Sequence, residues 1–107
     1  MIAGSRTIND IDLSQYVSKD VELIICGGAA GVDTVAEKYA DGCSISKLVL
    51  RPHYKKYGKA APLIRNNKMI EIADKVIVFW DGKSKGSKHT IEMSKKLKKE
   101  LTVIEFK

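Results

Sequence analysis

The chain has 107 residues and a formal net charge of +6, with 44% hydrophobic and 30% charged residues. These values are typical of one globular domain around one core, so we expect residues 1–107 to form a single domain. No stretch approaches the ~20 apolar residues of a membrane span, and the first residues lack the apolar segment of a signal peptide. We therefore expect a cytoplasmic protein without a membrane partner.

Short apolar runs alternate with amphipathic stretches along the chain. In order, the pattern predicts a strand over 1–3, helical turns within 10–17, a strand over 22–26, a helix over 31–41, a strand over 47–50, a loop over 51–60, a helix over 62–73, a strand over 75–80, a helix over 87–97 and a strand over 101–106. This alternation predicts a Rossmann-like three-layer α/β sandwich. We expect one parallel five-strand sheet in the order 3-2-1-4-5, covered by helices on both faces.

The cysteines and the basic residues bear on metal and nucleic-acid binding. Cys26 ends an apolar run and Cys43 ends a helical pattern, so we expect both to be buried, reduced thiols. No Cys or His pair has metal-ligand spacing, and we expect neither a metal nor a cofactor. Many lysines lie in the last quarter of the chain, mostly on the predicted helix over 87–97 and the loop before it. Such a face is usually only solvated, which leaves a basic nucleic-acid-binding protein as a secondary alternative.

Three loops that contain glycine follow the carboxyl ends of predicted strands. They are Gly4-Ser5-Arg6, Gly27-Gly28-Ala29-Ala30-Gly31-Val32-Asp33 and Asp81-Gly82-Lys83-Ser84-Lys85-Gly86-Ser87. In an open parallel sheet these ends share one edge, where ligands bind. Glycine lets backbone N–H groups approach an anion, and a helix N-terminus adds further donors. We therefore expect a phosphate-bearing ligand at this edge.

Side chains near these loops add polar groups to the same edge. Ser5, Ser87 and Thr90 supply hydroxyl groups, while Arg6 and Arg65 supply positive charge. Position 29 is alanine, so the loop after the second strand departs from the Gly-x-Gly-x-x-Gly dinucleotide pattern, and the chain has no Walker lysine-serine pair. ATP hydrolysis of the P-loop type is therefore not expected.

Four segments carry the most specific pattern of the chain. They are Ala3-Gly4-Ser5-Arg6, Gly27-Gly28-Ala29-x-Gly31-x-Asp33, Arg65-Asn66-x-x-Met69 and Phe79-Trp80-Asp81-Gly82-x-Ser84-x-Gly86-Ser87-x-His89-Thr90. In this order they resemble the YpsA-related branch of the SLOG superfamily, over nearly the whole chain. The resemblance implies a Rossmann-like fold and the binding of nucleotides, or of ligands related to NAD or ADP-ribose, by sensors or enzymes. It also implies a homo-oligomer, and a first strand longer than the one seen here.

The chain is more distantly similar to the Lonely Guy phosphoribohydrolases, which split the N-glycosidic bond of nucleoside 5′-monophosphates. Their arginine, four residues before a methionine, matches Arg65 and Met69. Their glutamate, in Pro-Gly-Gly-x-Gly-Thr-x-x-Glu, falls on Thr90, which cannot act as a carboxylate. Efficient phosphoribohydrolase activity is therefore not expected. A hydrolase of the glycosidic or phosphate bond stays open as the alternative, with Arg65, Asp33 and Asp81 as candidate catalytic residues.

The sequence thus predicts binding or sensing of a nucleotide-derived ligand at one edge of the sheet. Trp80 is either a stacking platform for a base or a residue that packs on the rim. The predicted ligand-binding residues are Gly4, Ser5, Arg6, Gly27, Gly28, Ala29, Gly31, Asp33, Arg65, Asn66, Trp80, Asp81, Gly86, Ser87 and Thr90.

Overall fold

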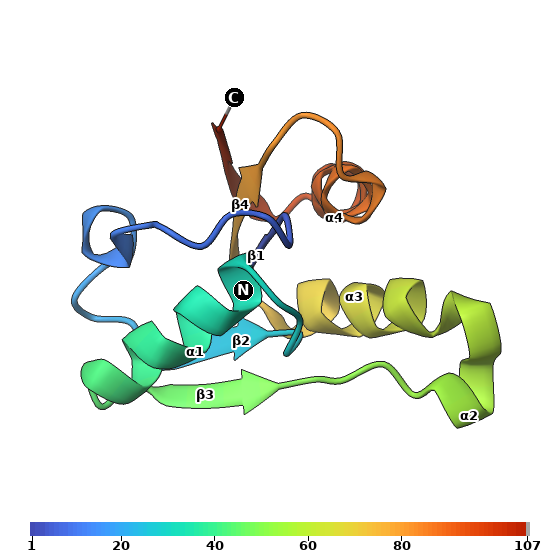
Figure 1. The fold of residues 1–107 in the computed structure, drawn as a ribbon, viewed down its shortest axis with the longest axis horizontal. Helices are drawn as coiled ribbons and strands as arrows, with labels where there is room; N and C mark the ends of the chain where they lie inside the picture. The colour runs from blue at the N-terminus through green and yellow to red at the C-terminus, as the bar shows by residue number, and fades with distance from the viewer. Residues whose placement is uncertain (107) are drawn as a thin grey trace.

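Strands and helices alternate along residues 1–106, the part of the chain that the computed structural model describes (Figure 1). The strands are β1 (Ile2–Gly4), β2 (Leu23–Cys26), β3 (Ser46–Val49), β4 (Lys75–Trp80) and β5 (Glu100–Glu105). The helices are α1 (Val32–Gly42), α2 (Tyr54–Tyr57), α3 (Ala61–Ile72) and α4 (Lys85–Lys96), with short 3₁₀ helices η1 (Leu13–Gln15) and η2 (Gly58–Ala60). None of these helices is long and apolar enough to cross a membrane.

The strands form two parallel sheets, so the prediction of a single five-strand sheet is wrong. β4 pairs with β1 and β5, whereas β2 pairs with β3. Within residues 1–106 no ladder of hydrogen bonds joins β1 to β2, which interrupts the expected order 3-2-1-4-5 at one junction. β1 is short, about 10 Å over three residues, and all three pair with β4 on its other side. Figure 1 shows β4 at a steep angle to β2 and β3.

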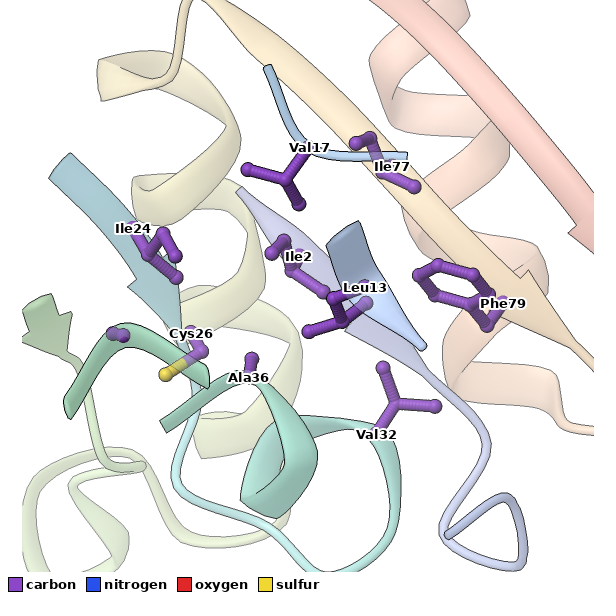
Figure 2. Close-up of a cluster of buried hydrophobic side chains, with 10 residues drawn as sticks. Ile2, Leu13, Val17, Ile24, Cys26, Val32, Ala36, Ile77 and Phe79 are labelled. Atoms are coloured by element: carbon purple, nitrogen blue, oxygen red, sulfur yellow. The ribbon is translucent and has the colours of Figure 1, made fainter. Parts of the chain in front are cut away.

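Alternate residues of the strands enter two apolar clusters, one on each face of the sheets. The cluster beneath α1 and η1 contains Ile2, Leu13, Val17, Ile24, Cys26, Val32, Ala36, Ala40, Ile77 and Phe79 (Figure 2). The cluster beneath α3 and α4 contains Met1, Ala3, Ile25, Met69, Ile70, Ala73, Val76, Val78 and Ile91. Both clusters include residues of β1, β2 and β4, so side-chain packing joins the two sheets where backbone pairing does not. The outcome is an α/β fold with helices on both faces of its parallel strands.

The segment 51–60 is more ordered than the loop that the sequence predicts. The ring of His53 accepts a hydrogen bond from the backbone N–H of Lys56, at 3.2 Å, and this contact caps the single turn of α2. Gly58, at a φ of 57°, ends that turn and is the first residue of η2, which leads into α3. The breakers Pro52 and Gly58 predict a loop, but they bracket the turn of α2: Pro52 precedes its N-cap, His53, and Gly58 is its C-cap.

The two cysteines differ in burial. Cys26 lies in the first apolar cluster, and burial raises the pKa of its thiol to about 11, as expected for an unreactive structural cysteine. Cys43 caps the C-terminus of α1 and is exposed, so the prediction that it is buried is wrong. Its position just past the last helical turn places it outside the buried face of α1.

Candidate functional site

The buried residue Ser5 joins the three glycine loops at the carboxyl ends of β1, β2 and β4. Its N–H donates to Phe79 O at 3.0 Å, and its Oγ accepts from the N–H of Asp81 at 3.1 Å. Its carbonyl accepts from the N–H of Val32 at 3.4 Å, which ties β1 to the first turn of α1. The loops therefore meet at one edge, as their parallel strands predict. Ser5 is 0% exposed and holds that edge together rather than facing solvent.

Two of the glycines are required by close backbone packing. A Cβ atom on Gly4 would overlap Phe79 O and lie 2.6 Å from Cγ2 of Val32. Gly31 has a φ of 74°, and a Cβ atom there would lie 2.5 Å from the carbonyl oxygens of Ser5 and Arg6. Both positions exclude a side chain because another part of the main chain fills the space. Neither glycine needs a ligand to explain it.

Arg65, on α3, holds the loop at residues 27–30 in place. Its Nη1 donates to Gly27 O at 2.6 Å and to Leu50 O at 3.1 Å, while its Nε donates to Asn66 Oδ1 at 2.8 Å. An arginine has five N–H donors, so these contacts leave those of Nη2 for another partner. Burial lowers the pKa of Arg65, the carboxylate of Asp33 opposes that effect, and the like charge of Arg6 adds to it.

Asp33, in the first turn of α1, supports the same loop from within. It is 8% exposed, and its Oδ2 accepts a hydrogen bond from the N–H of Ala29 at 3.1 Å. A Cβ atom on Gly27 would lie 2.5 Å from Nη1 of Arg65 and 3.0 Å from Oδ2 of Asp33, so both groups close around that glycine. Burial raises the pKa of Asp33, while its hydrogen bond from Ala29 and the charge of Arg65 lower it.

A cavity of about 370 Å³ opens beside this loop. We call it the arginine cavity, and its lining residues are Arg6, Gly27, Gly28, Ala29, Ala30, Arg51, Pro52, Tyr54 and Arg65. Three arginines thus line one cavity, and its lining contains no Asp or Glu. Arg51 lies over Gly28, donating from Nη1 to Gly28 O at 3.0 Å, and a Cβ atom on Gly28 would lie 2.9 Å from Cζ of Arg51.

The loop that leads into α4 lies outside this cavity and is organised by its own hydrogen bonds. Oδ1 of Asp81 accepts from the N–H groups of Lys83 and Ser84, both at 2.8 Å, and these bonds lower the pKa of Asp81. Nε1 of Trp80 donates to Ser84 O at 3.0 Å. Oγ1 of Thr90, a residue only 2% exposed, donates to Gly86 O at 3.1 Å. These polar groups stabilise the start of α4.

The structure therefore divides the predicted site residues into two groups. Those that line the arginine cavity are Arg6, Gly27, Gly28, Ala29 and Arg65. Those that do not line it are Gly4, Ser5, Gly31, Asp33, Asn66, Trp80, Asp81, Gly86, Ser87 and Thr90. The sequence interpretation missed Ala30, Arg51, Pro52 and Tyr54. Three of these directly follow β3, and the rule that ligands bind beyond the carboxyl ends of parallel strands could have identified them.

A larger cavity, of about 510 Å³, lies at the opposite ends of the strands. Its lining includes the acidic residues Asp20, Glu22 and Asp74 and no arginine, which suits an anionic ligand poorly. No cluster of three or more His, Cys, Asp or Glu residues within positions 1–106 is placed to hold a metal ion.

Comparison with known proteins adds one distant relative. The chain is 29% identical over 80 residues to the Gene 61 protein of Mycobacterium phage D29, an alignment that covers 69% of this chain and 64% of that protein. The chain thus spans less than two thirds of the length of this relative, whose name states no activity. No protein-family model and no solved structure matches the chain.

Proposed function

We propose that the protein binds a phosphate-bearing, nucleotide-derived ligand in the arginine cavity. The observation that carries this proposal is the convergence of Arg6, Arg51 and Arg65 on one cavity whose lining has no carboxylate. Guanidinium groups bind phosphate oxygens through pairs of N–H donors, and such contacts gain strength from charge. An anion in this cavity would also relieve the mutual repulsion of the three side chains.

The dimensions and the other walls of the cavity favour a nucleotide over inorganic phosphate. Its volume of about 370 Å³ lies within the range of small-molecule sites, which is roughly 300–1,000 Å³. Pro52 and the exposed ring of Tyr54 offer apolar surface for a sugar or a base. The resemblance to the YpsA-related branch of the SLOG superfamily supports the same ligand class, including ligands related to NAD or ADP-ribose, on a Rossmann-like fold.

We further propose binding or sensing rather than cleavage, because neither candidate carboxylate, Asp33 or Asp81, lines the arginine cavity and both are engaged by backbone N–H groups. The hydroxyl of Thr90, at the position of the Lonely Guy glutamate, is bonded to Gly86 O. Asp81 accepts two backbone N–H groups in its turn. Asp33 is buried beneath the loop and supports Ala29. Glycosidic cleavage ordinarily uses a pair of carboxyl groups that flank the bond.

Isothermal calorimetry tests this proposal with AMP, GMP, CMP, UMP and ADP-ribose as probes and the four nucleosides as controls. We expect at least one phosphorylated probe to bind, and its nucleoside to bind at least tenfold more weakly, since a charge-assisted hydrogen bond contributes about 1.5–3 kcal/mol. Equal binding of a nucleotide and its nucleoside, or no binding of any probe, would contradict the proposal. Binding of any nucleic acid with a steep salt dependence would instead favour a polyanion surface.

A further inference from the structure

Arg51 is held in place by its backbone, while its side chain stays accessible. The preceding residue, Leu50, donates its N–H to Cys26 O at 2.9 Å, which continues the pairing of β3 with β2. Leu50 O in turn accepts a hydrogen bond from Arg65. The chain therefore leaves β3 in a fixed direction, and the exposed side chain of Arg51 projects over Gly28.

The charge of Arg51 has no acidic partner in the part of the chain that the structure describes. The ion pairs among residues 1–106 join Lys47 to Glu37 and Asp41. The contact of Arg51 is instead with a neutral carbonyl, Gly28 O, and it comes from one nitrogen, Nη1. Nε and Nη2 therefore retain N–H groups with which to bind an anion.

Arg6 approaches the other end of the same loop. The backbone carbonyl group of Arg6 lies 2.5 Å from the place that a Cβ atom on Gly31 would take. The loop that follows β1 therefore packs against the residue that precedes α1. The side chain of Arg6 is exposed and lines the arginine cavity. The side chain of Arg51 thus contacts the 27–30 loop at Gly28, and the backbone of Arg6 packs against Gly31, just after that loop. Arg65 differs from both, because three of its five N–H groups already bind the protein.

We propose that Arg51 and Arg6 bind the phosphate of the ligand, and that Arg65 acts mainly as a positioning residue for the 27–30 loop. This inference rests on the proposed function and assigns the phosphate to one place within the cavity. The group recognised is a phosphate that carries at least two negative charges, as in a nucleoside 5′-monophosphate, because two exposed arginines without an ion pair among residues 1–106 line the cavity. Gly28 is required in this arrangement, since a side chain there would displace Arg51.

The test compares wild type with Arg51→Gln and Arg51→Lys, using AMP, GMP, CMP and UMP and their nucleosides as probes in calorimetry. Lys88→Gln, which removes an equal charge from the exposed face of α4, is the matched control. We expect Arg51→Gln to weaken nucleotide binding about ten- to hundredfold and to leave nucleoside binding unchanged. Arg51→Lys should recover part of the loss, because it keeps the charge without the paired donors. Lys88→Gln should match wild type.

The outcomes separate this inference from the proposed function. If wild type binds a nucleotide and Arg51→Gln binds it equally well, the inference is overturned while the proposed function stands. Equal losses for the nucleotide and its nucleoside would assign Arg51 to the shape of the cavity, which also overturns the inference. If wild type binds no nucleotide at all, the proposed function itself fails. The melting temperature of each variant checks its folding, and we expect no change for Arg51→Gln because the side chain is exposed.

Discussion

Replacement of Gly31 by alanine tests how the glycine loops are built. Gly31 has φ and ψ angles of 74° and −126°, a conformation that side chains disfavour by roughly 1–3 kcal/mol. The new Cβ atom would also lie 2.5 Å from backbone atoms of Ser5 and Arg6, which cannot rotate away. Such overpacking costs typically about 1–3 kcal/mol. Together the two effects should lower the free energy of unfolding by roughly 2–6 kcal/mol, a large part of the stability of a small domain.

Two other glycines separate the two contributions. Gly58 has nearly the same backbone angles, 57° and −132°, yet nothing lies within 4 Å of a Cβ atom placed there. Gly58→Ala should therefore show only the conformational cost of roughly 1–3 kcal/mol. Gly86 lies within α4 without a positive φ and also has open space around it. Gly86→Ala should stabilise the protein by up to about 1 kcal/mol, because alanine favours a helix.

Urea denaturation, followed through the fluorescence of Trp80, the single tryptophan, measures all three variants. The expected order of stability is Gly86→Ala, then Gly58→Ala, then Gly31→Ala. A free energy of unfolding for Gly31→Ala within about 0.5 kcal/mol of wild type would refute the packing described at the β1–α1 junction, because surface changes alone produce effects of that size. The same conclusion would follow if Gly31→Ala and Gly58→Ala had equal effects.

Three further predictions concern charged groups and catalysis. Arg65→Ala should lower the free energy of unfolding by about 1–3 kcal/mol in urea denaturation, since Gly27 O and Leu50 O lose a partly exposed partner. Burial raises the pKa of Asp33 in the folded state above its ordinary value of 3.8. Wild type should therefore lose stability relative to Asp33→Asn as the pH rises through 3.8, because the folded state holds the proton more tightly than the unfolded state. Melting temperatures of both proteins between about pH 3 and 6 measure this difference. The resemblance to the Lonely Guy enzymes places Thr90 where they have a glutamate, so chromatography of AMP, GMP, CMP and UMP after incubation should show release of free base far slower than about 1 s⁻¹.

The buried strands were predictable because a strand that is covered on both faces needs apolar side chains at every position, and the sequence shows such a run. Val76, Ile77, Val78 and Phe79 are all buried, and alternate members enter opposite clusters, as a continuous apolar run in a parallel sheet predicts. The break between β1 and β2 was not predictable in this way. The break concerns backbone hydrogen bonds, which the apolar pattern does not report. Ile2 of β1 and Ile24 of β2 lie in the same apolar cluster although their backbones do not pair.

The start of α4 shows why boundaries are harder to predict than the elements themselves. The helix begins at Lys85, two residues before the predicted start, because Ser84 accepts a hydrogen bond from the N–H of Ser87 and caps it. The residues Lys85 and Gly86 have no apolar periodicity, so the pattern could not include them. At the candidate site, glycines point to the Gly27 loop, whereas Arg51 could be found only from its position beyond the carboxyl end of β3, because its residue type alone carries no signal in a predicted loop.

The glycine loops look alike in the sequence but serve different purposes in the structure. Gly4 and Gly31 allow strands and helix to pack closely, whereas Gly27 and Gly28 allow Arg65 and Arg51 to approach the backbone. Gly86 meets no constraint at all. Glycine content alone is therefore weak support for anion binding in this fold. The stronger support comes from charge, because a chain of net charge +6 places three arginines around one cavity, whereas only four of its lysines lie on the exposed surface of α4. Guanidinium groups suit the bidentate recognition of a phosphate, whereas a solvated lysine face needs no ligand to explain it.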